Sequence, residues 1–403
     1  MTPVDLMEAS HQIPWGVENN WNSCSGGAEN LTALRNNPSR VLPRHCNRKI
    51  IFSPKSIKRT MPPKKRATIK QVAEHAHVSP MTVSNYVNGH FDLLSDKMKE
   101  RVSKSIKELN YRRNFGAHVL RTSQLWSIGL IIVDRSDEFL ADGYTTQITS
   151  GFSNYLNNNG YSLLLQGVKP EEFENSNIVR NLQTDAIGVL FSGDDAARQS
   201  QFELICELSQ PTVLFLEDFE NSTHKLCSIK QDEIAGGSQL AGAVLKYSPK
   251  HVAILTSGEN EWAAVNKRIA GMRRALDQAG VVDRIFTVPC GDTSFGDVSV
   301  SLERHVRDHG LPDAVMCIND YIAMSAITLL KRRGVDVPGR TCVTGFNAFQ
   351  LHQMSDPTIT TMQSPAYEMG QAGAKALLDC LDSDGFSDRV ITFPGILVQG
   401  ESA

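Results

Sequence analysis

The spacing of apolar and polar positions divides the chain into three regions. Residues 1–60 show no sustained apolar period and are rich in Asn, Ser, Pro and Gly, which is typical of a disordered segment. Residues 66–112 contain three short segments in which apolar positions recur at helical spacing. From Ser127 onward, apolar runs rich in Val, Ile and Leu alternate with longer segments of helical period. The pattern predicts a small helical domain followed by a larger α/β region.

Helix-start signals locate the small domain. Thr68, with Gln71 three residues later, is a capping-box pattern that opens a first helix. Ser79 and Pro80 give an N-cap followed by proline at the first helical position, and Ser95 caps a third helix. Two short helices joined by a tight turn and backed by a third predict a helix-turn-helix unit. A generic three-helix domain has the same periodicity.

The α/β region has the pattern of parallel sheets covered on both faces, because its apolar runs are nearly continuous and are separated by helices. The amount of alternation exceeds one small sheet, so two lobes are predicted, with ligands at the carboxyl ends of the strands. The predicted strands are residues 127–133, 161–166, 186–192, 212–217, 251–257, 314–320 and 341–346.

Charge separates the same regions. The whole chain of 403 residues has a net charge of −3, but residues 61–123 carry twelve Lys or Arg and five Asp or Glu, which gives +7. Residues 1–60 are at +4, and residues 124–403 are at −14. A compact basic module on an acidic body indicates a polyanion-binding head attached to a sensor or catalytic body. The basic module opens at Met61, and we expect the functional polypeptide to begin at or near this residue, with residues 1–60 a disordered or non-native extension.

Several classes of protein lack support in the sequence. No apolar run approaches the roughly 18 residues that span a bilayer, and no secretory signal is recognised. The eight cysteines are scattered without a C-x-x-C pair, as expected of thiols in a reducing cytoplasm, where we expect the protein to be located. The chain has no G-x-S-x-G, no P-loop, no G-x-G-x-x-G after a strand and no H-E-x-x-H. We therefore expect no enzyme activity, no catalytic residue, no metal and no cofactor.

Two segments, ATIKQVAEHAHVSPMTVSNYVNG and ERVSKSIKELNYRRN, resemble the DNA-binding head of the LacI/GalR family of bacterial transcription regulators. The resemblance continues in family order through IGLIIVDRSDEFL, AVNKRIAGMRRALDQAG, INDYIAMSAITLLKRRGVDVPGRTCVTGFN and GILVQGESA, and it covers residues 66 to 403. It implies an all-α helix-turn-helix head and a two-lobed α/β body of the type I periplasmic-binding-protein fold. The body is implied to dimerise and to bind a small metabolite between its lobes.

The resemblance also implies domain boundaries. The helix-turn-helix domain is expected at residues 66–112, a hinge helix at 113–123, and the effector-binding and dimerisation domain at 124–403. Within the last of these, the N-lobe is expected at about 124–228 and 362–388, and the C-lobe at about 229–360 and 390–403.

The family's DNA contacts carry over to eleven positions of this chain. They are Thr68, Pro80, Met81, Thr82, Ser84, Asn85, Asn88, Arg113, Asn114, Ala117 and Leu120. Met81 and Asn85 are assigned to base edges, since Asn pairs bidentately with adenine and Met can contact a thymine methyl. Thr68, Thr82, Ser84 and Asn88 are assigned to phosphates.

The hinge departs from the family pattern. Leu120 matches the leucine that wedges into the minor groove, and Ala117 matches the small residue before it. Arg113 stands where the family usually has Pro, and Gly116 lowers helix propensity by about 1 kcal/mol. We therefore expect a hinge helix of marginal stability.

The effector residues implied by the resemblance come from both lobes. They are Phe139, Ser192, Glu217, Asn266, Arg268, Asn319, Asp320 and Asn347. Asn266 stands where many members have an effector-binding Arg, and Asn347 where sugar-binding members have an Asp. These two departures predict a more neutral pocket, and the ligand class stays open among sugars, sugar acids, polyols and nucleoside-like molecules.

The function predicted from these features is a DNA-binding transcriptional regulator, most simply a repressor. It would act as a homodimer on a near-palindromic operator and respond to a small metabolite. Two alternatives remain at this stage. A solute-binding protein of a transport system would share the body fold, and an unrecognised α/β enzyme would share its strand pattern.

Overall fold

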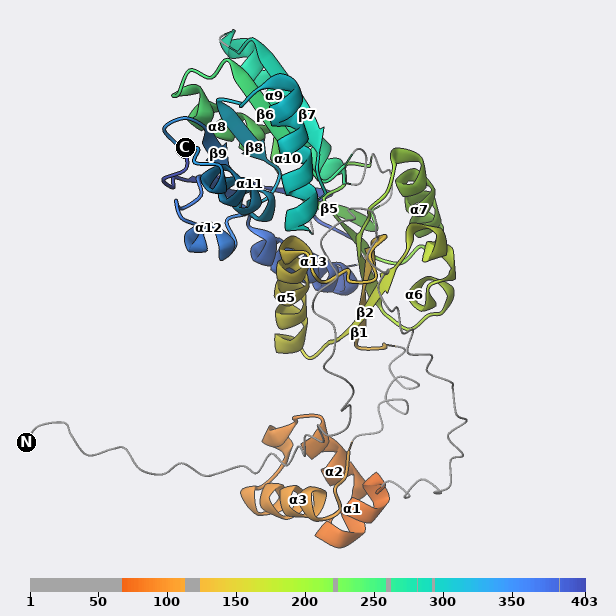
Figure 1. The fold of residues 1–403 in the computed structure, drawn as a ribbon. Helices are drawn as coiled ribbons and strands as arrows, with labels where there is room; N and C mark the ends of the chain where they lie inside the picture. Colours follow the sequence, from red (N-terminus) through yellow and green to blue (C-terminus); the bar gives the residue numbers. More distant parts are fainter. Residues whose placement is uncertain are drawn as a thin grey trace, which may run out of the picture. The chain divides into compact units, whose positions relative to one another are not determined.

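The computed structural model describes residues 67–112, 124–219, 224–258, 262–280, 282–291, 294–383 and 385–403. The chain divides into two compact units, one ending at Tyr111 and the other beginning at Arg112 (Figure 1). The expected N-terminal extension at 1–60 and the expected hinge helix at 113–123 lie outside the described residues.

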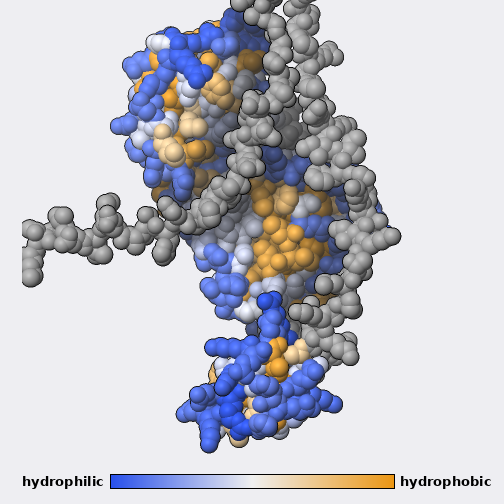
Figure 2. Space-filling model, turned by 60° about the horizontal axis from the view of Figure 1, so that its bottom comes forward, coloured by the Kyte–Doolittle hydropathy of each residue, from blue (hydrophilic) through white to orange (hydrophobic). Residues whose placement is uncertain are grey.

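The first unit, here called the head, is helical as predicted. Its elements are α1 (Ile69–Ala76), α2 (Pro80–Val87), the 3-10 helix η1 (Phe91–Leu93) and α3 (Asp96–Glu108). Apolar residues from all three α-helices and from Tyr111 form its small core, namely Val72, Ala73, Ala76, Val83, Val102 and Tyr111. Hydrophilic side chains cover most of the head in the view of Figure 2.

The second unit is the α/β body, and its N-lobe is built on a six-stranded parallel sheet. The strand order is β11-β5-β4-β3-β1-β2. The strands are β1 (Ser127–Val133), β2 (Ser162–Val168), β3 (Ala186–Leu190), β4 (Thr212–Phe215), β5 (Leu226–Gln231) and β11 (Val390–Phe393). The helical elements of this lobe are α5 (Gly143–Asn158), η2 (Pro170–Asn175), α6 (Asn177–Arg180), α7 (Asp195–Glu207) and α13 (Ala366–Ser383).

Helices cover both faces of this sheet, as the continuous apolar strands predict. Ile148 and Phe152 of α5 pack with Leu377 of α13 in one cluster, while Phe202 and Ile205 of α7 pack in another cluster on Val189 and Leu214 of the strands. A Cβ added at Gly370 would lie 2.2 Å from the Ile148 oxygen, so α5 and α13 approach at a distance that only glycine permits.

The C-lobe has a four-stranded parallel sheet in the order β7-β6-β8-β9, beside a two-stranded antiparallel sheet of β10 and β12. The strands are β6 (His251–Thr256), β7 (Arg284–Pro289), β8 (Ala314–Cys317), β9 (Cys342–Thr344), β10 (Thr361–Gln363) and β12 (Ile396–Val398). The helices are α8 (Glu233–Leu245), α9 (Ala263–Ala279), α10 (Phe295–His309), α11 (Asp320–Arg332) and α12 (Leu351–Met354). Core residues of α8 and α9 fall in one apolar cluster, and those of α10 and α11 in another.

The chain passes between the lobes three times, from β5 to α8, from β10 to α13 and from β11 to β12. The last crossing lies later than expected, because β11 at Val390–Phe393 pairs with β5 in the N-lobe sheet. The expected start of the second C-lobe segment at 390 is therefore too early. Strands β5, β7, β10, β11 and β12 are absent from the predicted set, since they carry polar residues or only three or four residues.

Across the described residues, none of the helices is both long and apolar enough to cross a membrane. The face of the body seen in Figure 2 carries a broad apolar area. Strand β2 ends the N-lobe sheet, and its Leu163, Leu164 and Leu165 side chains are half-buried.

Candidate functional site

Hydrogen bonds fix both the start of α1 and the turn between α1 and α2. The Gln71 amide donates to the Thr68 hydroxyl at 3.3 Å, and the Thr68 amide donates to Gln71 Oε1 at 2.9 Å, which completes the predicted capping box. His77 ends α1 in the left-handed conformation, with φ of 51°. The Arg101 guanidinium donates to the His77 carbonyl at 2.9 Å, so α3 holds the turn from behind.

Helix α2 presents different residues inward and outward. Val83 is fully buried, whereas Met81 is 68 % exposed. Ser79 caps the helix by accepting from the Thr82 amide at 3.1 Å, and Pro80 occupies its first turn. The outer face of α2 therefore carries both polar and apolar side chains, and none of the residues in Pro80–Val87 is charged.

The side chains assigned to DNA on and beside α2 differ in how far they are already engaged. Asn88 donates through Nδ2 to the Ser84 hydroxyl at 3.2 Å, and Thr82 Oγ1 lies 2.9 Å from Ser79 Oγ. The half-buried Asn85 side chain makes no hydrogen bond to another described residue. Its amide NH2 and its amide oxygen are therefore both available. The assigned hinge residues Arg113, Asn114, Ala117 and Leu120 lie outside the described residues.

Phe139, Ser192 and Glu217 follow strands of the N-lobe. The Phe139 ring lies against Gly167 of β2, where an added Cβ would be 2.3 Å from it. Ser192 is buried just after β3. Glu217, after β4, is buried and accepts from Arg198 Nη1 at 2.9 Å, and Arg198 also pairs with Asp195.

Burial raises the pKa of Glu217 to about 7, although the Arg198 guanidinium opposes the shift. The carboxylate is thus held inside the N-lobe by an arginine that the sequence pattern did not single out.

The C-lobe residues of the assigned set are also drawn into internal contacts. Arg268 is buried, donates through Nε to Glu233 Oε2 at 2.9 Å, donates through Nη1 to the Ile318 carbonyl, and stacks 3.5 Å above the Phe346 ring. Its guanidinium is largely used by the protein itself. Asn266 precedes it on α9, and its side chain is exposed.

A second group gathers where β8, β9 and β10 end. Asn319 caps α11 by accepting from the Ile322 amide at 2.8 Å. Asp320 accepts from the Thr361 hydroxyl at 2.6 Å, and burial raises its pKa to about 6. Asn347, at φ of 102°, accepts from the Ser364 hydroxyl at 3.2 Å. The fold brings these assigned residues to one edge of the sheet, as expected for the carboxyl ends of parallel strands.

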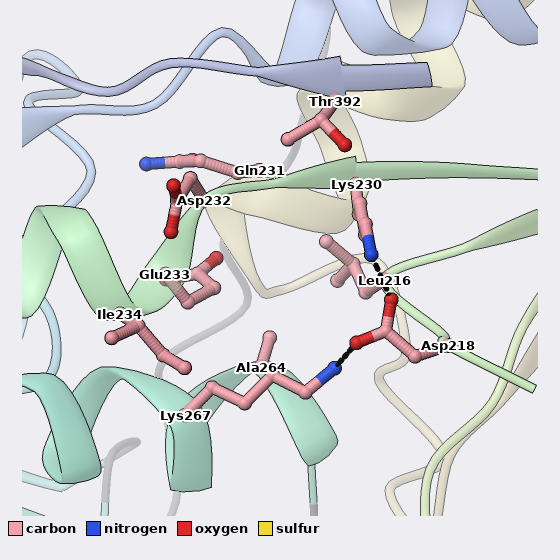
Figure 3. Close-up of a pocket in the computed structure, with 10 residues that line it drawn as sticks. All are labelled: Leu216, Asp218, Lys230, Gln231, Asp232, Glu233, Ile234, Ala264, Lys267 and Thr392. Carbon is pink, nitrogen blue, oxygen red and sulfur yellow. Dashed lines mark hydrogen bonds and ion pairs between the residues drawn. The ribbon is translucent and has the colours of Figure 1, made fainter. Parts of the chain in front are cut away.

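A cavity of about 300 Å³ lies between residues of the two lobes (Figure 3). Its lining consists of Leu216, Asp218, Lys230, Gln231, Asp232, Glu233, Ile234, Ala264, Lys267 and Thr392. None of the eight assigned effector residues is among them. The sequence analysis missed these lining residues because it did not predict strand β5. The pattern that could have indicated them is the polar end of LCSIKQDE, which lies just before a helix.

Asp218 joins the two lobes at this cavity. Its carboxylate pairs with Lys230 of β5 in its own lobe and with Lys267 of α9 in the C-lobe. Burial opposes ionisation, but the hydrogen bonds from the two lysines prevail and lower the pKa of Asp218. No group of three or more His, Cys, Asp or Glu suited to a metal occurs among the described residues.

Comparison with known proteins agrees with this two-part organisation. Residues 68–114 match the family model of bacterial regulatory proteins of the lacI family, and residues 248–403 match a periplasmic binding protein-like domain. The HTH-type transcriptional regulator RegA of Clostridium saccharobutylicum is 26 % identical over 83 % of this chain and 98 % of its own length. The ribose operon repressor of Haemophilus influenzae is 24 % identical over 83 % of this chain and 98 % of its own length.

Solved structures show the same fold. A lac repressor dimer bound to operator and the anti-inducer ONPF is 21 % identical, with a TM-score of 0.70 over 84 % of this chain and 99 % of that one. A complex of the transcriptional regulator CelR with cellobiose is 22 % identical, with a TM-score of 0.60 over 84 % of this chain and 100 % of that one. Residues 68–114 are therefore a lacI-type helix-turn-helix domain, which is followed by a periplasmic-binding-protein-like domain at residues 248–403.

Proposed function

We propose that this protein is a sequence-specific DNA-binding transcriptional repressor whose operator affinity is changed by a small molecule bound between the lobes of the body. The observation that carries the proposal is the outer face of α2. Met81 is exposed and Asn85 has an uncommitted amide, while Val83 on the same helix anchors it in the core. A capped helix held in this way offers base-reading groups from a rigid support.

Affinity for the DNA backbone would come from the basic residues of the head. Lys70 is an exposed cation on α1, and the head region as a whole is strongly positive. Lysines that neutralise phosphates release counterions, which gives affinity without sequence preference and makes it depend on salt. The relatives support this reading, since they are themselves named as transcriptional regulators and repressors.

The protein would act as a homodimer, matching a near-palindromic site with two heads. The half-buried leucines of the edge strand β2 and the apolar area seen in Figure 2 support a second copy as partner. The relatives also favour a regulator over an enzyme or a transport solute-binding protein. The positions assigned to DNA and effector, including the hinge residues, remain predictions within this proposal.

DNA binding with salt titration tests the proposal. We expect affinity for one near-palindromic fragment from the protein's own genomic neighbourhood to exceed affinity for random DNA, and to fall steeply as salt rises. Equal binding to operator candidates and random DNA at every salt concentration would contradict it.

Two substitutions separate the proposed roles. Asn85→Ala should relax the preference at one base pair, losing roughly 1–3 kcal/mol of discrimination there. Lys70→Ala should weaken all sequences about equally and reduce the salt slope by about one. The assignment fails if the two variants lose affinity and specificity in the same way.

A further inference from the structure

The carboxylate of Asp185 holds the chain where it enters strand β1. Asp185 directly precedes β3, and its two oxygens accept from the backbone amides of Leu125 at 2.8 Å and of Ser127 at 3.3 Å. The Asp185 amide in turn donates to the Ser127 carbonyl at 2.7 Å. Hydrogen bonds from backbone N–H groups to a carboxylate are charge-assisted and stronger than neutral ones. The chain just before β1 is therefore fastened to the start of a strand that lies 58 residues away.

Trp126 lies between the two amides that Asp185 holds, and it bends the backbone. Its φ of 51° falls in the left-handed region, which is uncommon for a bulky residue and persists only where the surrounding structure supports it. Its carbonyl accepts from the Ser162 amide at 2.9 Å, and its ring centroid lies 5.1 Å from that of Tyr161. Contacts from the start of β2 and from the start of β3 together fix the bend.

The bend lies at the body end of the connection to the head. The head ends at Tyr111, and most of the chain from there to Gln124 lies outside the described residues. Strand β1 is an inner strand of the N-lobe sheet, with β3 on one side and β2 on the other. The connection therefore starts from a point whose conformation is set by three strands of the body.

The C-lobe contains an equivalent contact at a place where no other domain is attached. Asp313 directly precedes β8 and accepts from the amides of Lys250 at 2.9 Å and of His251 at 3.0 Å, at the start of β6. Its own amide donates to the His251 carbonyl at 2.9 Å, and its carboxylate is half-buried, as that of Asp185 is. The chain arrives there from α8 of the same lobe. The two contacts thus share their chemistry and differ in what precedes them.

We propose that Asp185 is a positioning residue for operator binding. By fixing the bend at Trp126, it fixes the body end of the connection to each head of a dimer. Once one head is bound, a well-defined connection raises the effective concentration of the other head at its half-site, because less conformational freedom remains to be lost. The inference rests on the proposed repressor function, in which two heads bind two half-sites.

The test compares two DNA fragments bound by the full-length protein. One is the near-palindromic fragment that the native protein prefers, and the other is the same fragment with one half-site scrambled. The ratio of the two dissociation constants measures what the second head adds. Asp185→Ala should lower this ratio roughly tenfold and leave binding to the scrambled fragment within about twofold of native, since each head is unchanged. A native ratio for Asp185→Ala overturns the proposal.

Asp313→Ala is the matched control, because it removes the equivalent contact from the lobe to which no head is attached. Asp313 also pairs with Arg340 at 3.2 Å, so this variant should lower the melting temperature of the body at least as much as Asp185→Ala does. We expect the ratio of dissociation constants to stay native. Equal reductions of the ratio by the two variants would assign the effect to general destabilisation of the body and would overturn the proposal.

Two further measurements identify the cause of a reduced ratio. Hydrogen exchange of the Leu125 and Ser127 amides should be faster in Asp185→Ala, and sedimentation should give the native dimer fraction. Unchanged exchange, or a smaller dimer fraction, overturns the proposal. If Asp185→Ala does not fold, Asp185→Asn keeps the shape and one acceptor oxygen, and it should lower the ratio by a smaller factor. A native ratio for that variant then overturns the proposal.

The outcomes separate this inference from the proposed function. If the native protein binds no fragment better than random DNA, the repressor function fails, and the role of Asp185 fails with it. If the native protein and Asp185→Ala both prefer the near-palindromic fragment by the same factor, the repressor function stands and only the role of Asp185 is refuted.

Discussion

The head and the α/β body differ in where they keep their charged groups. Among the described residues of the head, the buried side chains are apolar apart from Ser105, and the ion pairs, such as Lys99 with Asp96, lie at the surface. The body buries two complete ion pairs, Arg198 with Glu217 and Arg268 with Glu233. The head is held by local caps and a small apolar core. The body combines a large apolar core with internal charge pairs that depend on distant segments.

This difference matters for function because a buried pair limits the roles of its members. Arg268 and Glu217 were assigned to a ligand, yet each is bonded to another buried side chain. In the head, the amide of Asn85 has no such partner in the described residues and stays free for another molecule. Exposure and free hydrogen-bonding groups, rather than residue type, separate the two cases.

The largest expected effect comes from breaking a buried pair in the body. Arg268→Met should lower the free energy of unfolding of the body by about 3–5 kcal/mol, because Glu233 would be left as an uncompensated buried charge. Urea unfolding followed by tryptophan fluorescence measures the loss. The matched control is Lys331→Met, which removes an exposed pair with Asp356 and should cost less than about 1 kcal/mol. Equal losses from the two variants would show that burial does not set the strength of these pairs.

A smaller effect should follow from pH. His251 and His305 lie with their Nε2 atoms 2.9 Å apart on β6 and α10, and both side chains are buried. Burial, followed by the nearby His251, His309 and Arg284, lowers the pKa of His305 to about 4. The fold therefore favours the neutral ring, and the stabilisation is complete above pH 6.5 and is lost as the pH falls toward 4.

Urea unfolding of the body between pH 7 and pH 4 tests this. After allowance for solvent screening, we expect about 2 kcal/mol of the pH-dependent loss to come from His305. His305→Phe keeps an aromatic ring and removes the titration, so it should flatten the curve. A variant with the native pH dependence would assign the loss to other groups.

The smallest effect is expected in the head. Thr68→Ala removes the side-chain cap of α1 and should cost about 1 kcal/mol of head stability, read from hydrogen exchange of the α1 amides. Ser95→Ala is a matched control, since Ser95 occupies the N-cap of α3 without a side-chain cap hydrogen bond. Ser95→Ala should change the hydrogen exchange of the α3 amides less than Thr68→Ala changes that of the α1 amides. Similar losses from both would mean that the hydrogen bond is not what the cap contributes.

The predictions made from the sequence succeeded where the signal is local. The capping box of Thr68 and Gln71 and the Ser79–Pro80 helix start are formed as predicted. The strands read from long apolar runs are also present, among them β1, β3 and β6. Helix caps and apolar periodicity depend on residues only three or four positions apart, so they can be recognised from the sequence alone.

Strand β5 shows the limit of prediction from local sequence signals. LCSIKQ carries Lys230 and Gln231 and has no long apolar run, yet it pairs on both sides within the N-lobe sheet. Its place in the sheet, and with it the cavity that follows, depends on pairing with strands far away in the chain. The partners of Asp218 were missed for the same reason, because Lys267 is 49 residues distant.

By itself, the sequence determined the helical head, the alternation of strands and helices in the body, and the charge contrast between them. The tertiary structure decided which polar side chains form internal pairs and which have no hydrogen-bond partner among the described residues. The physical reason is the range of the interactions. Helix caps and apolar periodicity depend on neighbours along the chain. The ion-pair partner of the buried Glu233, and the lack of a partner for the Gln231 amide among the described residues, depend on segments that pack against them from elsewhere in the chain.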